Sequence, residues 1–337
     1  MPSRYLTLLG AFCETHLALV GNQRAAALRQ LHRALALGRG LGMFGLHWWL
    51  PVNMGRLCAE ALAAAVEVDY VRSLIRRNRL PLSAAALALE TWPWPIKIRV
   101  MGAFELVLDD RPVDATGKAP HRCLMFLRAL AALDGHNVHQ DTLTDSVWPD
   151  TDGDAGRRSF DTTLHRLRHL LGHHDALTLH NGLLSLNRAY CWLDAWALEA
   201  LCEQLSRALA AGTAIDYGSV ERLLALYRGR LLELEPDQGW LVIRRQRLSQ
   251  RFVRTITALG RHYEEHGAWK NAIACYRESL AGETSNEILY QRLMHLYIRH
   301  GRYAEAVGIY RQCRTVLATL HLIPSVETER ILVGIPP

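Results

Sequence analysis

The side chains best suited to chemistry lie on one face of a predicted helix over residues 157–171. With a period of 3.6 residues, a polar and cationic face is formed by Arg158, Thr162, His165, Arg166 and His169. The opposite face is apolar and consists of Phe160, Leu164, Leu167 and Leu171. Guanidinium groups bind phosphate oxygens strongly. The helix is therefore predicted to bury one face and to meet an anionic partner with the other.

Further cations flank this polar face. Arg157 and Arg168 lie at its edges and are expected to contact a phosphate backbone, although Arg157 could instead pair with Asp161 one turn further on. Exposed arginines on helices are usually only solvated charges, so their assignment depends on the surrounding fold. His165 and His169 are four residues apart but lack a nearby third ligand, and no metal site is predicted.

The segments before this helix predict two more helices. Residues 120–133 carry apolar side chains at helical spacing, and residues 141–148 form a shorter helix that Pro149 ends. An Asp- and Gly-rich loop over residues 150–156 then leads into the cationic helix. Three helices in this order are typical of a helix-turn-helix.

Short strands are expected on both sides of the three helices. Residues 177–186 alternate apolar side chains around Asn181-Gly182, a pair that favours a tight type I′ hairpin turn. Residues 96–108 alternate well enough for one or two strands, and residues 109–112 turn the chain. The three helices, the hairpin and the leading strands together predict a winged helix-turn-helix preceded by a small sheet.

An internal repeat occupies the C-terminal part of the chain. The segment Gly267 to Tyr276 (GAWKNAIACY) recurs as Gly301 to Tyr310 (GRYAEAVGIY), a period of 34 residues. This is the length of a tetratricopeptide repeat, in which a small alanine lets paired helices approach and a glycine turns one helix into the next. The chain is therefore expected to be mainly α with a small β component.

The N-terminal residues 1–90 are dense in Ala and Leu and predict about one and a half degenerate helical-repeat units. A Trp- and Pro-rich linker over residues 91–95 follows, because its two prolines block helix continuation. We expect a semi-rigid elbow there, and the alternative is a docking motif for proline-binding modules. The winged helix is thus flanked by two α-helical, tetratricopeptide-like regions.

Four pieces of the central region match one family in order and spacing: IRVMGAFELVLDDRPV, LMFLRALAALDGHNV, LTDSVWPD and SFDTTLHRLRHLLG. They resemble the OmpR/PhoB-type winged helix of the SARP family of bacterial activators. The C-terminal repeats are similar to the bacterial transcriptional activator domain that follows this winged helix in the family. The resemblance covers residues 96–333, and the whole is also similar to the C-terminal part of large MalT-like regulators.

The resemblance implies a sequence-specific DNA-binding regulator, expected to be an activator, that inserts helix 157–171 into the major groove. Arg158 and Arg166 are then the residues expected to contact guanine, because bidentate arginine–guanine contacts discriminate between bases. The resemblance also implies contact with RNA polymerase through the loop Trp148–Gly156, although the acids of this loop could equally form an ordinary acidic turn. The implied domains are a helical-repeat segment (1–90), the linker (91–95), the winged helix (96–191) and the activator domain (192–337).

The hairpin departs from the family. Residues 175–187 contain no Lys or Arg and only His180 at the tip, whereas a wing that enters a minor groove usually carries a cation. Leu183-Leu184 stands where the family usually has Gly-Tyr. Arg188, just after the hairpin, is expected to supply a phosphate contact instead.

Composition excludes several classes of protein. The 337 residues are 50% hydrophobic and 21% charged with a net charge of +6, which is ordinary for folded domains. The seven cysteines show no metal or redox spacing, and we expect reduced thiols in the cytoplasm. No apolar run could cross a membrane and no signal peptide is visible. Catalytic motifs are absent, so neither an enzyme nor a cofactor is predicted.

Two other functions stay open at this stage. The chain could be a helical-repeat scaffold whose winged helix binds protein rather than DNA. The repeats could also sense a small ligand or a protein effector and thereby control DNA binding. The cationic helix favours double-stranded DNA as the partner.

Overall fold

The computed structural model describes residues 4–21, 23–45, 50–113 and 118–333, which are mainly α-helical with two small sheets. This agrees with the predicted fold class. The chain divides into two compact units. The first comprises Met1–Ile98, Glu105–Leu127 and Gly135–Ala197, and the second comprises Arg99–Phe104, Arg128–Asp134 and Leu198–Pro337.

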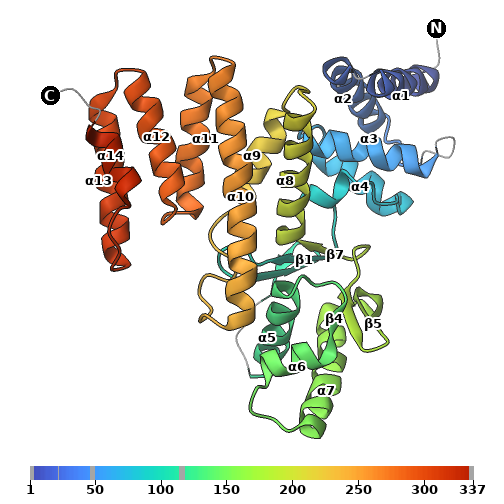
Figure 1. The fold of residues 1–337 in the computed structure, drawn as a ribbon. Helices are drawn as coiled ribbons and strands as arrows, with labels where there is room; N and C mark the ends of the chain where they lie inside the picture. Colours follow the sequence, from blue (N-terminus) through green and yellow to red (C-terminus); the bar gives the residue numbers. More distant parts are fainter. Residues whose placement is uncertain (1–3, 22, 46–49, 114–117, 334–337) are drawn as a thin grey trace. The chain divides into compact units, whose positions relative to one another are not determined.

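The first unit begins with four α-helices, α1 (Arg4–Val20), α2 (Arg24–Gly40), α3 (Pro51–Ala63) and α4 (Val68–Asn78). Helices α1 and α2 lie side by side (Figure 1) and bury Leu8 and Leu35 between other apolar side chains. Four helices make two pairs, so the one and a half repeats expected from the sequence were too few. Glu67, with a φ of 47°, separates α3 from α4, and the apolar pattern alone did not reveal this break.

The Trp- and Pro-rich linker is packed into the first unit. Trp92 is 4% exposed and Trp94 is 1% exposed. The Trp94 indole Nε1 donates a hydrogen bond to the Leu89 carbonyl at 2.8 Å. The aromatic side chains are therefore core, and they are not presented as a docking motif for a proline-binding module.

Two sheets frame the three central helices. The four-stranded sheet has the order β3-β2-β1-β7 and the three-stranded sheet has the order β4-β6-β5. The strands are β1 (Ile96–Arg99), β2 (Glu105–Leu108), β3 (Arg111–Pro112), β4 (Val138–His139), β5 (Leu177–His180), β6 (Leu183–Leu186) and β7 (Cys191–Leu193). Strand β1 pairs with β7 in parallel, with Ile96 opposite Cys191. The predicted strands and hairpin are confirmed, and the short strands β3, β4 and β7 are additional.

The three central helices are α5 (Lys118–Ala132), α6 (Gln140–Val147) and α7 (Gly153–Leu171). An aromatic cluster holds them together: the Phe126 and Phe160 ring centroids are 5.3 Å apart in an edge-to-face arrangement, and the Trp148 ring lies 6.0 Å from that of Phe126. This cluster anchors α7 against α5.

The helices that begin at α8 form the larger part of the second unit. They are α8 (Asp194–Ala210), α9 (Tyr217–Leu226), α10 (Gly239–Glu265), α11 (Trp269–Gly282), α12 (Glu287–Arg299), α13 (Tyr303–Thr319) and α14 (Val326–Val333). Figure 1 shows α10 to α13 side by side and alternating in direction.

The 34-residue repeat appears in the backbone of these helices. Gly267 and Gly301, at corresponding positions, have φ values of 72° and 68°, a conformation that glycine adopts without strain. Ala272 and Ala306 are both fully buried. The expected roles of the glycine and the alanine in each repeat are therefore confirmed.

Candidate nucleic-acid interface

Helix α7 is defined by capping interactions at both ends. The Asp152 side chain accepts a hydrogen bond from the Ala155 amide at 2.7 Å, which satisfies one of the free donors of the first turn. Gly172, with a φ of 70°, ends the helix. The helix starts at Gly153, so the loop predicted up to Gly156 is too long.

The connection between α6 and α7 is correspondingly short. Its Trp148 ring packs against Phe126, and Asp152 is used as the cap, which leaves Asp150 as the exposed acid outside the helix. Contact with RNA polymerase through this turn stays a prediction.

The apolar face of α7 is buried as its period predicts. The exposed fractions of Phe160, Leu164, Leu167 and Leu171 are 1%, 3%, 0% and 2%. Gly156 extends this contact surface toward α6, because a Cβ atom there would lie 2.8 Å from Thr144 Cγ2. The orientation of the helix about its axis is thereby set.

The polar face of α7 is exposed. All of its predicted contact residues are exposed, namely Arg158, Thr162, His165, Arg166 and His169, together with Arg157 at the edge. Among the described residues no ion pair joins Arg157 to Asp161, so the internal pairing considered above is not formed. The guanidinium groups on this face have no carboxylate partners in the part of the chain that the structure describes.

Arg168 differs from the other cations of the helix. Its Nη2 donates to the carbonyl of Leu177 at 3.0 Å, and the side chain is half-buried. The bond joins α7 to the first residue of β5. Arg168 thus orients the hairpin, and a phosphate contact would have to use its remaining donors.

The hairpin after α7 has the predicted turn. Asn181 and Gly182 have φ values of 49° and 75°, as a type I′ turn requires at both central positions. His180 pairs with Leu183 across it and is exposed. Arg188 is also exposed, with its guanidinium carbon 4.7 Å from the Trp196 ring centroid. That contact holds Arg188 beside an aromatic face rather than at the hairpin tip.

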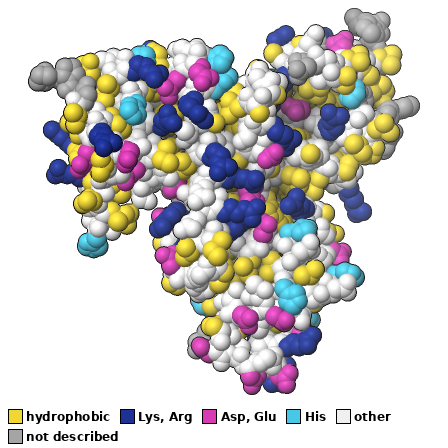
Figure 2. Space-filling view, in the orientation of Figure 1, with side chains coloured by type: hydrophobic (Ala, Val, Ile, Leu, Met, Phe, Trp, Pro, Cys, Tyr) yellow, Lys and Arg dark blue, Asp and Glu magenta, His cyan; other side chains and the backbone are white. Residues whose placement is uncertain are grey.

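Sequence reasoning missed a second group of cations, in α10. Arg247, Arg251 and Arg254 line a pocket between α8 and α10, and Figure 2 shows basic side chains gathered over these two helices. The sequence contains a signal for this group, since these arginines recur at intervals of four and three residues and therefore share one helix face.

Among the described residues, none of the helices has the length and apolar character that a membrane-spanning helix requires.

The C-terminal part of the chain matches a known protein domain, and part of the chain is similar to a bacterial regulatory protein. The family model for the bacterial transcriptional activator domain matches residues 193–332. "Regulatory protein AfsR" of Streptomyces griseus is 27% identical over 206 residues, which cover 60% of this chain and 21% of that protein. The chain thus spans about a fifth of the length of this relative.

A solved structure has a similar fold. It is Mycobacterium tuberculosis EmbR in complex with a low-affinity phosphopeptide, at a TM-score of 0.50 and 23% identity, covering 72% of this chain and 66% of that one. At this identity the likeness concerns the fold. The chain therefore carries a region, residues 193–332, that matches the bacterial transcriptional activator domain, and part of its length is similar to a bacterial regulatory protein.

Proposed function

We propose that this chain binds double-stranded DNA through α7 and activates transcription from the bound site. In this proposal residues 96–191 are the DNA-binding domain, and residues 192–337 and 1–90 supply partner or effector surfaces. The observation that carries the proposal is the polar face of α7, whose arginines are exposed and have no carboxylate partner among the described residues, while the opposite face is buried.

The geometry of α7 fits a groove-binding helix. From Arg158 to His169 the polar face extends roughly 16 Å at a rise of about 1.5 Å per residue. The major groove of B-DNA is about 12 Å wide and admits an α-helix. A helix held by an aromatic core on one side presents such a face without further rearrangement.

Within the face, Arg158 and Arg166 are proposed to read bases, and Thr162, His165 and His169 to contact base edges or nearby phosphates. Each arginine that binds guanine in a bidentate way contributes roughly 1–3 kcal/mol of discrimination, which corresponds to about 5- to 150-fold in affinity.

The cations at the edge of the interface have other proposed roles. Arg157 is proposed to contact phosphate. The hydrogen bond of Arg168 to Leu177 favours a role in orienting the hairpin, with phosphate contact as a secondary one. Arg188 can serve the backbone only if it leaves Trp196, so its contribution is expected to be small.

The test is selection of random-sequence duplex DNA on the purified chain at near-physiological salt. The parent should enrich a shared sequence and the variant R158A/R166A should not. The matched control is R311A/R314A, which removes the same two charges from the exposed face of α13 and should enrich the same sequence as the parent. Equal enrichment by R158A/R166A and the parent would refute the proposal.

A further inference from the structure

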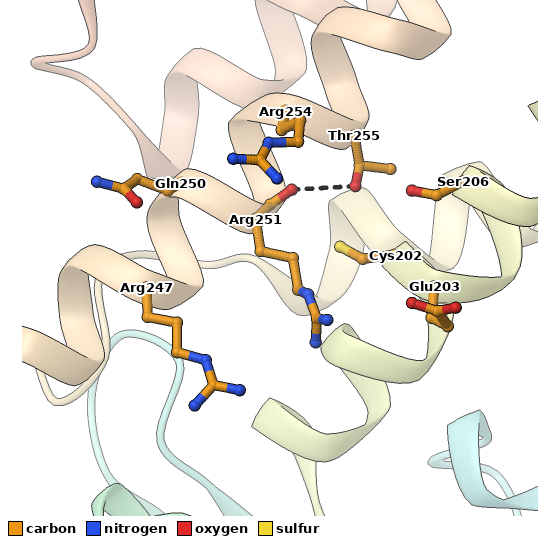
Figure 3. Close-up of a pocket in the computed structure, with 8 residues that line it drawn as sticks. All are labelled: Cys202, Glu203, Ser206, Arg247, Gln250, Arg251, Arg254 and Thr255. Atoms are coloured by element: carbon orange, nitrogen blue, oxygen red, sulfur yellow. Dashed lines mark hydrogen bonds between the residues drawn. The ribbon is translucent and has the colours of Figure 1, made fainter.

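The second unit contains a pocket that the proposed DNA contact does not use. It lies between α8 and α10 and has a volume of about 400 Å³, within the range of small-molecule sites. Its lining consists of Cys202, Glu203, Ser206, Arg247, Gln250, Arg251, Arg254 and Thr255 (Figure 3). All of these residues belong to the same compact unit.

Three arginines of α10 give the pocket its character. Arg247, Arg251 and Arg254 occupy one side of the helix, and Figure 3 shows the Arg247 and Arg251 side chains extending from α10 in a similar direction. Arg247 and Arg254 are exposed and form no ion pair among the described residues. The Nη1 atom of Arg251 lies 3.5 Å from Glu199 and forms an ion pair with it.

The neighbouring carboxylates already have closer partners. Arg244 donates to both carboxylate oxygens of Glu199 at 3.1 Å, and Arg207 pairs with Glu203 at 3.2 Å. Because these acids are neutralised by other arginines, they do not balance the charge of Arg247 and Arg254. The pocket therefore presents an excess of positive charge.

The rest of the lining adds hydrogen-bonding groups and no competing anion. Ser206 and Gln250 contribute a hydroxyl and an amide. The hydroxyl of Thr255 donates to the Arg251 carbonyl at 3.0 Å, which ties up that side chain within α10. Burial raises the pKa of the Cys202 thiol to about 11, against the lowering effect of Thr255 and Arg251, so the thiol is neutral at pH 7.

The spacing of the arginines indicates the size of the anion. Their Cα atoms extend over roughly 10 Å along the helix, at about 1.5 Å per residue. One phosphate group can be held by two neighbouring guanidinium groups, but it is too small to bridge all three. The lining contains no aromatic side chain on which a nucleobase could stack.

From this arrangement we propose that the pocket between α8 and α10 is a binding site for a small ligand with two adjacent phosphate groups. Arg247 and Arg251 hold one phosphate. Arg254 holds the other phosphate together with Arg251, which lies between Arg247 and Arg254 along α10. Guanidinium groups suit this task because their planar donors match phosphate oxygens. The site is independent of the DNA contact proposed for α7.

The experiment is isothermal titration of the full chain with pyrophosphate, without divalent cations and at fixed ionic strength. Saturable binding is expected, with orthophosphate at least tenfold weaker because it cannot engage all three arginines. R247A/R254A should weaken pyrophosphate binding at least tenfold. R311A/R314A, which lowers the net charge equally, should leave the affinity within twofold of that of the parent.

Several outcomes would overturn the proposal. One is the absence of saturable pyrophosphate binding up to millimolar concentration by the folded parent. Another is an equal loss in R247A/R254A and R311A/R314A, which would mean that only net charge matters. A third is that R247A/R254A binds pyrophosphate as the parent does but retains less duplex DNA in the selection described above. That result would assign these arginines to contact with a nucleic-acid backbone. Circular dichroism of each variant confirms that the comparison is between folded proteins.

Discussion

Replacing Gly260 with alanine tests how closely the repeat helices pack. A Cβ atom at this position of α10 would lie 2.1 Å from both Cζ and the hydroxyl oxygen of Tyr276. The Tyr276 side chain on α11 is fully buried, so its ring has little room to withdraw. Its hydroxyl also donates to Glu264 at 3.4 Å, and a displaced ring would lose that contact.

Two effects of opposite sign determine the magnitude. Overpacking a core costs about 1–3 kcal/mol, and alanine gains about 1 kcal/mol over glycine within a helix. A contact of 2.1 Å is far below van der Waals distance, so the upper part of the cost applies. We expect G260A to lower the free energy of unfolding by about 2 kcal/mol.

A second helical glycine supplies the control. Gly308 of α13 is exposed, and a Cβ atom there would meet nothing within 4 Å. G308A should therefore stabilise the protein by about 1 kcal/mol. The assay is urea unfolding followed by circular dichroism, with Y276L added to G260A to relieve the clash. A G260A variant as stable as G308A, or no relief from Y276L, would refute the close packing of α10 against α11.

Three further predictions concern the first unit. L167A should lower stability by about 2–5 kcal/mol in urea unfolding, because the side chain is fully buried; a neutral effect would mean that α7 is turned differently. D110N should cost about 1 kcal/mol, since its carboxylate pairs with Lys97 and two arginines of α4 but is partly exposed. Burial would raise the pKa of Asp110, but these cations lower it to about 2. The contribution of the ionised Asp110 carboxylate to the free energy of unfolding is therefore fully present above the ordinary pKa of 3.8 and is lost as pH falls toward 2. The D110N variant should lack that acid-dependent part of the stability curve. G182A should destabilise the hairpin by about 1 kcal/mol because the φ of 75° disfavours alanine, and faster amide exchange in β5 and β6 would detect it.

Local patterns made several elements predictable. The burial of Phe160 and Leu167 follows from the 3.6-residue period of α7, and the turn at Asn181-Gly182 follows from the backbone preferences of those two residues. The repeat from Gly267 to Gly301 was visible because each copy forms the same local helix junction. These features depend on residues that are close together in the chain.

Other features depend on residues far apart in the chain and escaped prediction. The parallel pairing of Ile96 with Cys191 joins strands at opposite ends of the winged-helix region. Strand β7 is only three residues long, too short to show a recognisable alternating pattern in the sequence. The burial of Trp94 depends on the surrounding core of the first unit, so its Pro-rich neighbourhood indicated an elbow instead. Short segments carry too little periodicity to specify their partners.

The candidate sites also combine features that local sequence predicts with features that depend on residues far apart in the chain. The sequence by itself determined which residues of α7 share a polar face, because helical geometry alone sets that relation. Only the tertiary structure decided that Arg168 turns to Leu177 and that Arg247 and Arg254 of α10 line a pocket without an ion pair among the described residues. The reason is physical: periodicity specifies which side of an element is buried, whereas the partner of each charged side chain is set by whatever the folded chain brings within a few ångströms of it.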